Sequence, residues 1–328
     1  MTSSLRSLDH IKEPVAAELD RFADFFKESM RSNVKLVDTV ARYVVKQKGK
    51  RIRPILVFLA AKTCGGITES TFRGATLVEI LHTATLVHDD VVDDAETRRG
   101  LASINAVWKN KIAVLMGDYL LSTGLMVALR HDDFFFLKVT SDAVRRMAEG
   151  EILQIQKSRD LDIDEETYLK IISNKTASLL STCTEIGAAS VSDDAGIRTA
   201  MREFGQNLGM AFQIRDDLLD LTSRSSILGK PVGGDIKEKK MTLPLIHALK
   251  TAPAREAKAV VRLVKKGADT KDIAEIVAFI ERYDGLSYSA ARARDFAEQS
   301  RLRLTPFPDS DAKQSLLDFV EFVIQRDK

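Results

Sequence analysis

The clearest indication of the fold is the stretch TLVEILHTATLVHDDVVDD, which runs from Thr76 to Asp94. Its apolar residues recur at helical spacing, with Leu77, Leu81 and Val87 on overlapping stripes. A helix that is apolar around most of its circumference is buried in a large bundle or lies in a membrane. Because charged residues are interspersed along the chain, we expect a helical bundle.

The same spacing recurs along almost the whole chain. It predicts helices over residues 15–30, 34–45, 76–94, 108–129, 134–155, 165–189, 197–221, 242–249, 254–264, 272–283, 287–302 and 311–324. The chain has 17 glycines and 7 prolines, a share well under the roughly 12% of an average protein, and this favours long helices. No linker, low-complexity segment or tandem repeat divides it. We therefore expect a single all-α domain over residues 1–328.

Composition excludes several classes of protein. Lys and Arg number 49 against 47 Asp and Glu, and a net charge of +2 lacks the basic excess of a nucleic-acid binder. Cys64 and Cys183 have no metal-binding spacing, so they indicate reduced thiols in a cytoplasmic protein. No uninterrupted apolar run approaches the ~18 residues of a transmembrane helix, and the N-terminus does not resemble a signal peptide.

Two acidic clusters follow strongly apolar helical segments. HDDVVDD covers residues 88–94 and QIRDDLLD covers residues 213–220, and each contains DDxxD. Aspartates four residues apart share a helix face, where like charges repel. One such motif is typical of a solvated acidic face, but two copies in apolar surroundings favour bound cations. Oxygen ligands without nearby His or Cys suit Mg²⁺ or Mn²⁺, and Mg²⁺ commonly shares its coordination shell with substrate phosphates.

Basic residues accompany the acidic clusters. They are Lys50, Arg51 and Arg53 in one loop, Arg98 and Arg99 after the first cluster, and Lys175 and Lys230 further along. Each alone is typical of a surface cation. Together with the aspartates they favour a site for two diphosphates, held partly by metal ions and partly by Arg and Lys.

These motifs resemble those of the trans-isoprenyl diphosphate synthases, also called polyprenyl synthetases. The matching stretches are GKRIRP (49–54), LVHDDVVDDAETRRG (86–100), EGEILQ (149–154), NKTA (174–177), FQIRDDLLD (212–220) and GKPVGGD (229–235). The resemblance implies the isoprenoid-synthase fold, a helical bundle around a central cavity. It also implies head-to-tail condensation of isopentenyl diphosphate onto an allylic diphosphate by a cytoplasmic homodimer.

The resemblance further implies a role for each matched residue. Two Mg²⁺ ions would bind Asp89 and Asp93, with Asp90 in support, and a third would bind Asp216, with Asp217 and Asp220 close by. Isopentenyl diphosphate would contact Lys50, Arg53, His82 and Arg99. The allylic diphosphate would contact Arg98, Lys175, Thr176, Gln213 and Lys230. Mn²⁺ would be able to replace Mg²⁺.

Product length is expected to depend on the helix before the first motif. Ala84 and Thr85 lie five and four residues before Asp89, where short-chain relatives place an aromatic side chain. Because both are small, the product tunnel should continue toward Leu81, about 12 Å below Asp89. HTATLVHDDVVD (82–93) is most similar to octaprenyl-type synthases that make quinone side chains. We expect a C40 product within a C30–C50 range, a farnesyl diphosphate primer, and room for transient membrane contact during lipid release.

Three alternatives stay open. They are a short-chain farnesyl or geranylgeranyl diphosphate synthase, a non-catalytic subunit of a heteromeric synthase, and another terpenoid enzyme. Cyclases usually lack the paired DDxxD and the GKRIRP loop, head-to-head synthases lack the isopentenyl site, and regulatory subunits typically lose aspartates that this chain keeps. The C-terminal Arg326-Asp327-Lys328 is similar to basic tails that cover the site in relatives, and a frayed terminus fits these residues equally well.

Overall fold

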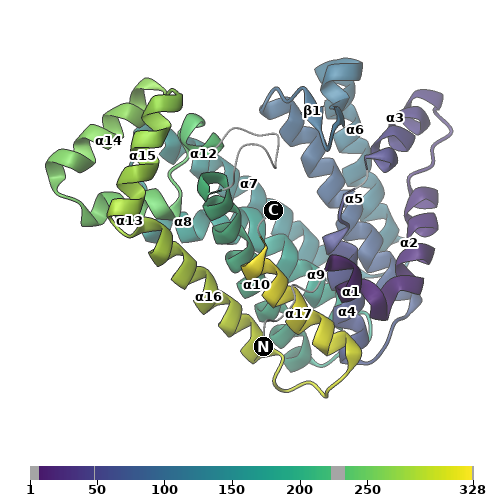
Figure 1. Cartoon of the computed structure of the whole chain (residues 1–328). Coiled ribbons are helices and arrows are strands. Elements are labelled where there is room, and N and C mark those ends of the chain that lie inside the picture. The colour runs from purple at the N-terminus through teal and green to yellow at the C-terminus, as the bar shows by residue number, and fades with distance from the viewer. Residues whose placement is uncertain (1–6, 48, 223–232, 327–328) are drawn as a thin grey trace.

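Helices make up nearly all of the part of the chain that the computed structural model describes, residues 7–47, 49–222 and 233–326 (Figure 1). The first elements are α1 (Leu8–Lys12), η1 (Glu13–Val15), α2 (Ala16–Ser29), α3 (Lys35–Lys46), α4 (Ile52–Cys64), α5 (Glu69–Val92), β1 (Thr97–Arg98), β2 (Leu101–Ala102), α6 (Ile104–Leu129) and α7 (Phe134–Asp160). They are followed by α8 (Glu165–Ile172), η2 (Ser173–Ala177), α9 (Ser178–Ala189), α10 (Ala195–Thr222), α12 (Gly234–Lys237), α13 (Leu243–Thr251), α14 (Ala254–Lys266), α15 (Thr270–Arg282), α16 (Gly285–Arg303) and α17 (Asp311–Gln325). The predicted all-α fold is confirmed.

Local signals explain where the predicted helix boundaries were wrong. Helix α5 begins seven residues before the predicted start because the Thr68 side chain accepts the Thr71 N–H, and Thr71 in turn caps the Thr68 N–H. The predicted helix 165–189 is divided by η2, a π-helical turn. Helix α4 was not predicted as a segment. It starts at Ile52, so Pro54 stands at the third position of the first turn, where its missing N–H is harmless.

Two groups of buried apolar side chains hold the helices together. The larger lies among α4, α5, α9, α10 and α17, where Phe58, Leu77 and Phe319 are fully buried. The smaller lies among α8, α13, α14, α15 and α16. Helix α10 contributes Leu208 to the first group and Ile214 to the second. Figure 1 shows the resulting two arms, α13–α16 on one side and α2–α6 on the other, with α10 between them.

Two glycines allow the close helix contacts that bring the motifs of one site together. A Cβ on Gly209 of α10 would lie 2.5 Å from Ala177 Cα of η2. A Cβ on Gly150 of α7 would lie 3.1 Å from Lys175 N. Any larger side chain would push η2 away from both helices, so these positions fix Lys175 against α7 and α10.

A short hairpin follows the first acidic motif. Strands β1 and β2 pair antiparallel, with Thr97 opposite Ala102 and Arg98 opposite Leu101. The two turn residues, Arg99 and Gly100, both have positive φ, 51° and 78°. Positive φ at both positions is the mark of a type I′ turn, which suits a tight hairpin. The hairpin, which we did not predict, directs Arg98 and Arg99 back toward α5.

Helix α6 is the one described helix long and apolar enough to cross a membrane by length and composition alone. Only 33% of its most apolar 18-residue window is buried. Lys111 and Asp118 interrupt the apolar sequence of α6, so it contains no uninterrupted apolar run of transmembrane length. In the structure α6 lies along α5 as part of the bundle.

Candidate active site

The three aspartates of the first acidic motif differ in what their carboxylates contact. Asp90 is 3% exposed, and its Oδ1 accepts hydrogen bonds from Arg98 Nε at 2.8 Å and Nη2 at 2.5 Å. The carboxylates of Asp89 and Asp93 make no hydrogen bond or ion pair with any described residue. Burial raises the pKa of Asp89, the charge of Glu151 raises it further, and Lys175 opposes the rise. Asp89 and Asp93 are therefore the two carboxylates of this motif that are free to take a ligand.

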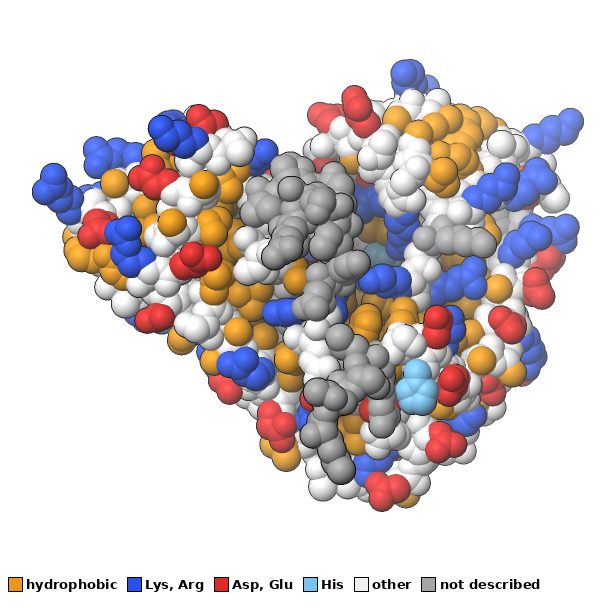
Figure 2. All heavy atoms as spheres, in the orientation of Figure 1, with side chains coloured by type: hydrophobic (Ala, Val, Ile, Leu, Met, Phe, Trp, Pro, Cys, Tyr) orange, Lys and Arg blue, Asp and Glu red, His pale blue; other side chains and the backbone are white. Residues whose placement is uncertain are grey.

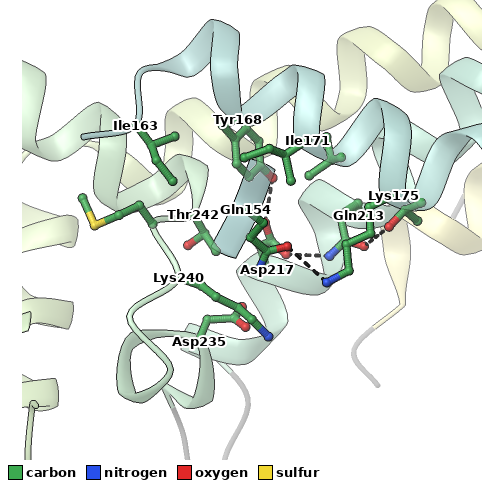
Figure 3. A pocket seen from close by; sticks show the side chains of 13 residues that line it. Gln154, Ile163, Tyr168, Ile171, Lys175, Gln213, Asp217, Asp235, Lys240 and Thr242 are labelled. Carbon is green, nitrogen blue, oxygen red and sulfur yellow. Dashed lines mark hydrogen bonds between the residues drawn. The ribbon is translucent and has the colours of Figure 1, made fainter. Parts of the chain in front are cut away.

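In the second acidic motif, the Asp217 carboxyl group is enclosed by protein. Its Oδ2 accepts a hydrogen bond from the Tyr168 hydroxyl at 2.6 Å, and its Oδ1 accepts one from Gln213 Nε2 at 2.8 Å (Figure 3). Burial raises the pKa of Asp217 to about 8, and the charge of Asp235 adds to the rise. The hydrogen bond to Asp217 holds Gln213 in position.

The other two aspartates of this motif have different partners. Asp220 accepts the backbone N–H groups of Gly234 at 3.2 Å and Asp235 at 3.1 Å, which fastens the start of α12 to α10. Asp216 forms an ion pair with Arg326 from the C-terminus. Burial raises the pKa of Asp216, while the charges of Arg326 and of Lys50 lower it. The basic loop and the C-terminus therefore both reach the second motif.

The π-helical turn η2 presents consecutive polar side chains to both motifs. Lys175 Nζ lies 2.5 Å from Glu151 Oε2 and donates to Gln154 Oε1 at 3.1 Å. The Thr176 hydroxyl donates to Gln213 Oε1 at 2.7 Å. A π-turn holds one more residue than an α-helical turn and occurs frequently at functional sites. Through these contacts η2 connects α7, which lies beside the first motif, to α10, which carries the second.

A small pocket of about 100 Å³ lies beside Asp217, and Figure 3 shows Asp235 and Lys240 across it from α8 and η2. Burial raises the pKa of Asp235 to about 6, and the charge of Asp220 contributes. Burial by itself lowers the pKa of Lys240, but a hydrogen bond to Glu238 and the charges of Asp235 and Asp93 outweigh it and raise that pKa. Lys240 therefore interacts electrostatically with carboxylates beside both motifs.

Three of the four residues predicted for isopentenyl diphosphate lie close together, because the charges of Arg53 and Arg99 both act on His82. His82 is buried and Arg53 is half-buried with its Nε enclosed, and Arg99 donates to the Gln47 carbonyl at 3.1 Å, whereas Lys50 is exposed. Burial lowers the pKa of His82 well below 6.5, and the charges of Arg53 and Arg99 lower it further. His82 is therefore a neutral hydrogen-bonding group among cations.

The acidic residue Glu79 lies among these basic residues, and we did not predict it. Its Oε2 and the Arg53 Nε are buried, and neither has a hydrogen-bond partner among the described residues. Burial raises the pKa of Glu79, and the charges of Arg53 and Arg99 oppose the rise. A buried donor and acceptor left unpaired cost stability, and they mark a place where a polar ligand or water would bind. Glu79 gave no signal in the sequence because it reads as one polar residue on an apolar helix.

A cavity of about 480 Å³ lies next to Asp89, between α5, α7 and α9. Thr85 lines its α5 wall, and Val144, Met147 and Ile152 line its α7 wall. The predicted tunnel residues Ala84 and Leu81 do not line it and are buried beside it, 2% and 1% exposed. Figure 2 shows Lys and Arg side chains gathered in the hollow between the two arms, with apolar side chains deeper inside.

The donor set fits a metal that is shared with a ligand rather than caged by protein. Among the described residues, no group of three or more His, Cys, Asp or Glu side chains could hold a metal ion. Mg²⁺ is commonly bound by one or two carboxylates together with substrate phosphates and water. Two free carboxylates at the end of α5, a third paired only with a guanidinium, and surrounding cations match that pattern. Lys230, predicted to contact the allylic diphosphate, lies outside the described residues.

The comparisons with known proteins agree with this geometry. A profile of the polyprenyl synthetase family matches residues 34–280. The chain belongs to the polyprenyl synthetase family. It is 38% identical to an all-trans-nonaprenyl-diphosphate synthase (geranyl-diphosphate specific) of Rhodobacter capsulatus, over 96% of this chain and 97% of the relative. It is 33% identical to the octaprenyl diphosphate synthase of Escherichia coli strain K12, over 98% of this chain and 100% of that enzyme.

A solved structure shows the same likeness in three dimensions. A polyprenyl synthase from Caulobacter crescentus CB15, complexed with calcium and isoprenyl diphosphate, superposes with a TM-score of 0.91. It is 32% identical in sequence, and the match covers 99% of this chain and 100% of that one. The predicted family and prenyltransferase activity are confirmed, and long-chain synthases among the relatives support the predicted long-chain activity without settling its product length.

Proposed function

We propose that this polyprenyl synthetase adds isopentenyl diphosphate units to an allylic diphosphate and releases a C40 trans-polyprenyl diphosphate, within a C30–C50 range. The observation that carries the proposal is the pairing of two acidic motifs, on α5 and α10, through Lys175 on η2 and Lys240 between them. Carboxylates and cations in this alternation suit two diphosphate groups better than any neutral substrate. Relatives that match this chain over nearly its full length are prenyl diphosphate synthases, and this supports the same function.

The free carboxylates suggest how three Mg²⁺ ions would be held. Asp89 and Asp93 would bind two of them together with the allylic diphosphate, and Asp216 would bind the third. Asp90, Asp217 and Asp220 would not bind the metal ions directly but would position neighbouring groups, because each is hydrogen-bonded to protein groups. Bound Mg²⁺ supplies positive charge that stabilises the departing diphosphate.

The remaining chemistry is assigned to side chains of this chain. Lys175, Thr176, Gln213 and Arg98 would bind the allylic diphosphate, as would Lys230. As the allylic C–O bond breaks, these donors stabilise the negative charge on the pyrophosphate that leaves.

A second group of side chains would hold the nucleophile. Lys50, Arg53, His82 and Arg99 would orient isopentenyl diphosphate so that its double bond attacks the allylic carbocation. A proton then leaves, and the pyrophosphate oxygens can accept it, so no general base from the protein is required. The apolar side chains of the α7 wall, Val144, Met147 and Ile152, keep water away from the cation.

The cavity volume bears on product length. An apolar cavity of about 150 Å³ accommodates benzene, which corresponds to about 25 Å³ per carbon. The 480 Å³ cavity is also lined by Asp89 and Lys175, so the diphosphate takes part of it, and by that measure the cavity holds a tail of at most about 19 carbons. A longer tail would leave through the cavity opening, where Val92, Ile152 and Ile155 are exposed apolar side chains. An exit of this kind supports a product longer than C20.

Assembly and location are also part of the proposal. The exposed face of α6 carries Val107, Val114, Leu115, Met126 and Leu129. Although the exposed Lys111 and Asp118 interrupt them, these apolar side chains are suited to contact with a second copy of the chain, and we propose a homodimer formed through α6. Light scattering of the purified protein tests it. We further propose that the enzyme works in the cytoplasm and that its lipid product leaves through brief membrane contact.

Product analysis tests the activity directly. Purified protein is incubated with Mg²⁺ and labelled isopentenyl diphosphate, using farnesyl diphosphate or geranyl diphosphate as primer, and the dephosphorylated products are separated by chromatography. We expect C30–C50 chains with C40 in the majority. A C15 or C20 product would instead assign a short-chain synthase, and absence of any product would favour a regulatory subunit.

The metal assignment is tested in the same assay. EDTA should abolish turnover and added Mg²⁺ should restore it. Asp89→Ala and Asp216→Ala should each reduce kcat at least about 10²-fold, the scale of losing a preorganised electrostatic contact. Full turnover in metal-free buffer would contradict the assignment.

A further inference from the structure

The last described residue, Arg326, is clamped onto α10 by both its side chain and its backbone. Its guanidinium pairs with the Asp216 carboxylate, donates to the Phe212 carbonyl at 3.0 Å, and lies 4.0 Å from the centroid of the Phe212 ring. Its own carbonyl accepts hydrogen bonds from Arg215 Nη2 at 2.8 Å and Nε at 3.2 Å. The residue is only 7% exposed, although it directly follows the end of α17.

This contact places a positive charge at a carboxylate that we assign to a metal. Of the three aspartates proposed as metal ligands, Asp216 is the one with a cationic partner, because Asp89 and Asp93 have none among the described residues. The guanidinium is thus a stand-in cation at Asp216. Its fit is incomplete, since the Arg326 Nε is buried and has no hydrogen-bond partner within the described chain. An unpaired buried donor carries a free-energy cost that would be relieved if the side chain moved.

We propose that Arg326 is a tethered cation that occupies Asp216 in the metal-free protein and is displaced when a divalent ion binds there. The inference rests on the proposed function, which gives Asp216 the third metal. A guanidinium and a divalent ion repel each other at one carboxylate, so each must weaken the binding of the other. By linkage, the effect is reciprocal: metal binding loosens the C-terminus, and a closed C-terminus weakens metal binding. The C-terminus would thereby report whether the second acidic motif is loaded.

Metal binding to variants tests the competition. The probe is Mn²⁺, counted by electron paramagnetic resonance in the presence of a saturating allylic thiodiphosphate, an analogue that resists ionisation. Arg326→Met removes the charge and keeps much of the bulk, and it should tighten the Asp216-dependent Mn²⁺ site about tenfold. If the Arg326–Asp216 contact is closed about nine-tenths of the time, it weakens the apparent affinity for Mn²⁺ about tenfold. Arg326→Lys, which keeps the charge without the planar fork, should lie between Arg326→Met and wild type.

The matched control removes an equal charge from elsewhere. Arg303 on α16 pairs with Glu203 at 3.0 Å and is half exposed, and Arg303→Met should leave every Mn²⁺ affinity unchanged. A second readout uses the wild-type protein alone. The Arg326 N–H donates to the Phe322 carbonyl at 3.0 Å, and hydrogen exchange in the last turn of α17 should accelerate when Mn²⁺ binds.

The outcomes separate this inference from the proposed function. If Asp216→Asn removes one Mn²⁺ but Arg326→Met leaves the affinity equal or weaker, the metal assignment stands and the competition is refuted. If Asp216→Asn retains all the Mn²⁺ of wild type, the third metal is not at Asp216, and both statements are wrong. Tighter Mn²⁺ binding in Arg326→Met together with faster exchange in wild type supports the inference.

Discussion

Replacing Thr85 by phenylalanine should convert this enzyme to a producer of short chains. Thr85 lies on the cavity wall four residues before Asp89, which places it about 6 Å below that carboxylate along α5. Its hydroxyl is satisfied by the His82 carbonyl of the same helix at 2.8 Å. The substitution therefore leaves no other buried group unpaired, and its main effect is the volume of the ring.

The size of the effect follows from the cavity. An aromatic ring occupies about 150 Å³ in an apolar cavity, close to a third of the 480 Å³ available. The space that remains accommodates about 13 carbons at about 25 Å³ each. We expect Thr85→Phe to make mainly C15 with some C20, while the first condensation stays near the wild-type rate because the metal ligands are untouched.

Ala84→Phe is the matched control, because the sequence placed Ala84 and Thr85 on the same tunnel. Ala84 is 2% exposed and does not line the cavity, so its ring would be forced into packed core. We expect Ala84→Phe to lower the unfolding free energy by about 1–3 kcal/mol and to shorten the product less than Thr85→Phe. The assays are chromatography of dephosphorylated products and urea denaturation. Wild-type chain lengths from Thr85→Phe, or stronger shortening by Ala84→Phe, would refute the reasoning.

Four further substitutions test the site. Arg53→Ala should raise KM for isopentenyl diphosphate and Lys175→Ala should raise KM for the allylic substrate, each about tenfold or more, and identical kinetic profiles would contradict the two-site assignment. Tyr168→Phe should lower the unfolding free energy by about 1–3 kcal/mol in urea denaturation, because Asp217 loses a buried donor, and an unchanged midpoint would count against that contact. Burial lowers the pKa of His82 well below 6.5, so below pH 6.5 the unfolded state takes up a proton that the folded state does not. The unfolding free energy of the wild type should therefore fall by about 1.4 kcal/mol per pH unit below 6.5, compared with that of His82→Gln. Parallel pH profiles of the two proteins would contradict a neutral His82.

Much of the protein could be predicted from local pattern. The apolar period of 76–94 and the scarcity of Gly and Pro indicate buried helices, because helical spacing depends only on neighbours in sequence. The DDxxD spacing places the first and last aspartate of each motif on one helix face for the same reason. The ordered motifs were enough to indicate the family, and that prediction is confirmed.

Tertiary structure decided which of those residues are free. The sequence does not distinguish Asp90, Asp217 and Asp220 from the other aspartates of the two motifs. In the structure each of the three accepts a hydrogen bond from a donor in another segment. Tyr168 stands 49 positions from its partner Asp217, and Arg326 stands 110 positions from Asp216. No local pattern encodes such contacts, because they arise only when separate helices pack.

The same reason explains the tunnel. Adjacent residues on a helix point about 100° apart, so one of Ala84 and Thr85 can face the cavity while the other faces the core. Which of them does so depends on how α5 is rotated against α6 and α7. That rotation is set by the packing of the whole bundle, and only the structure shows that Thr85 forms the wall while Ala84 lies in the core.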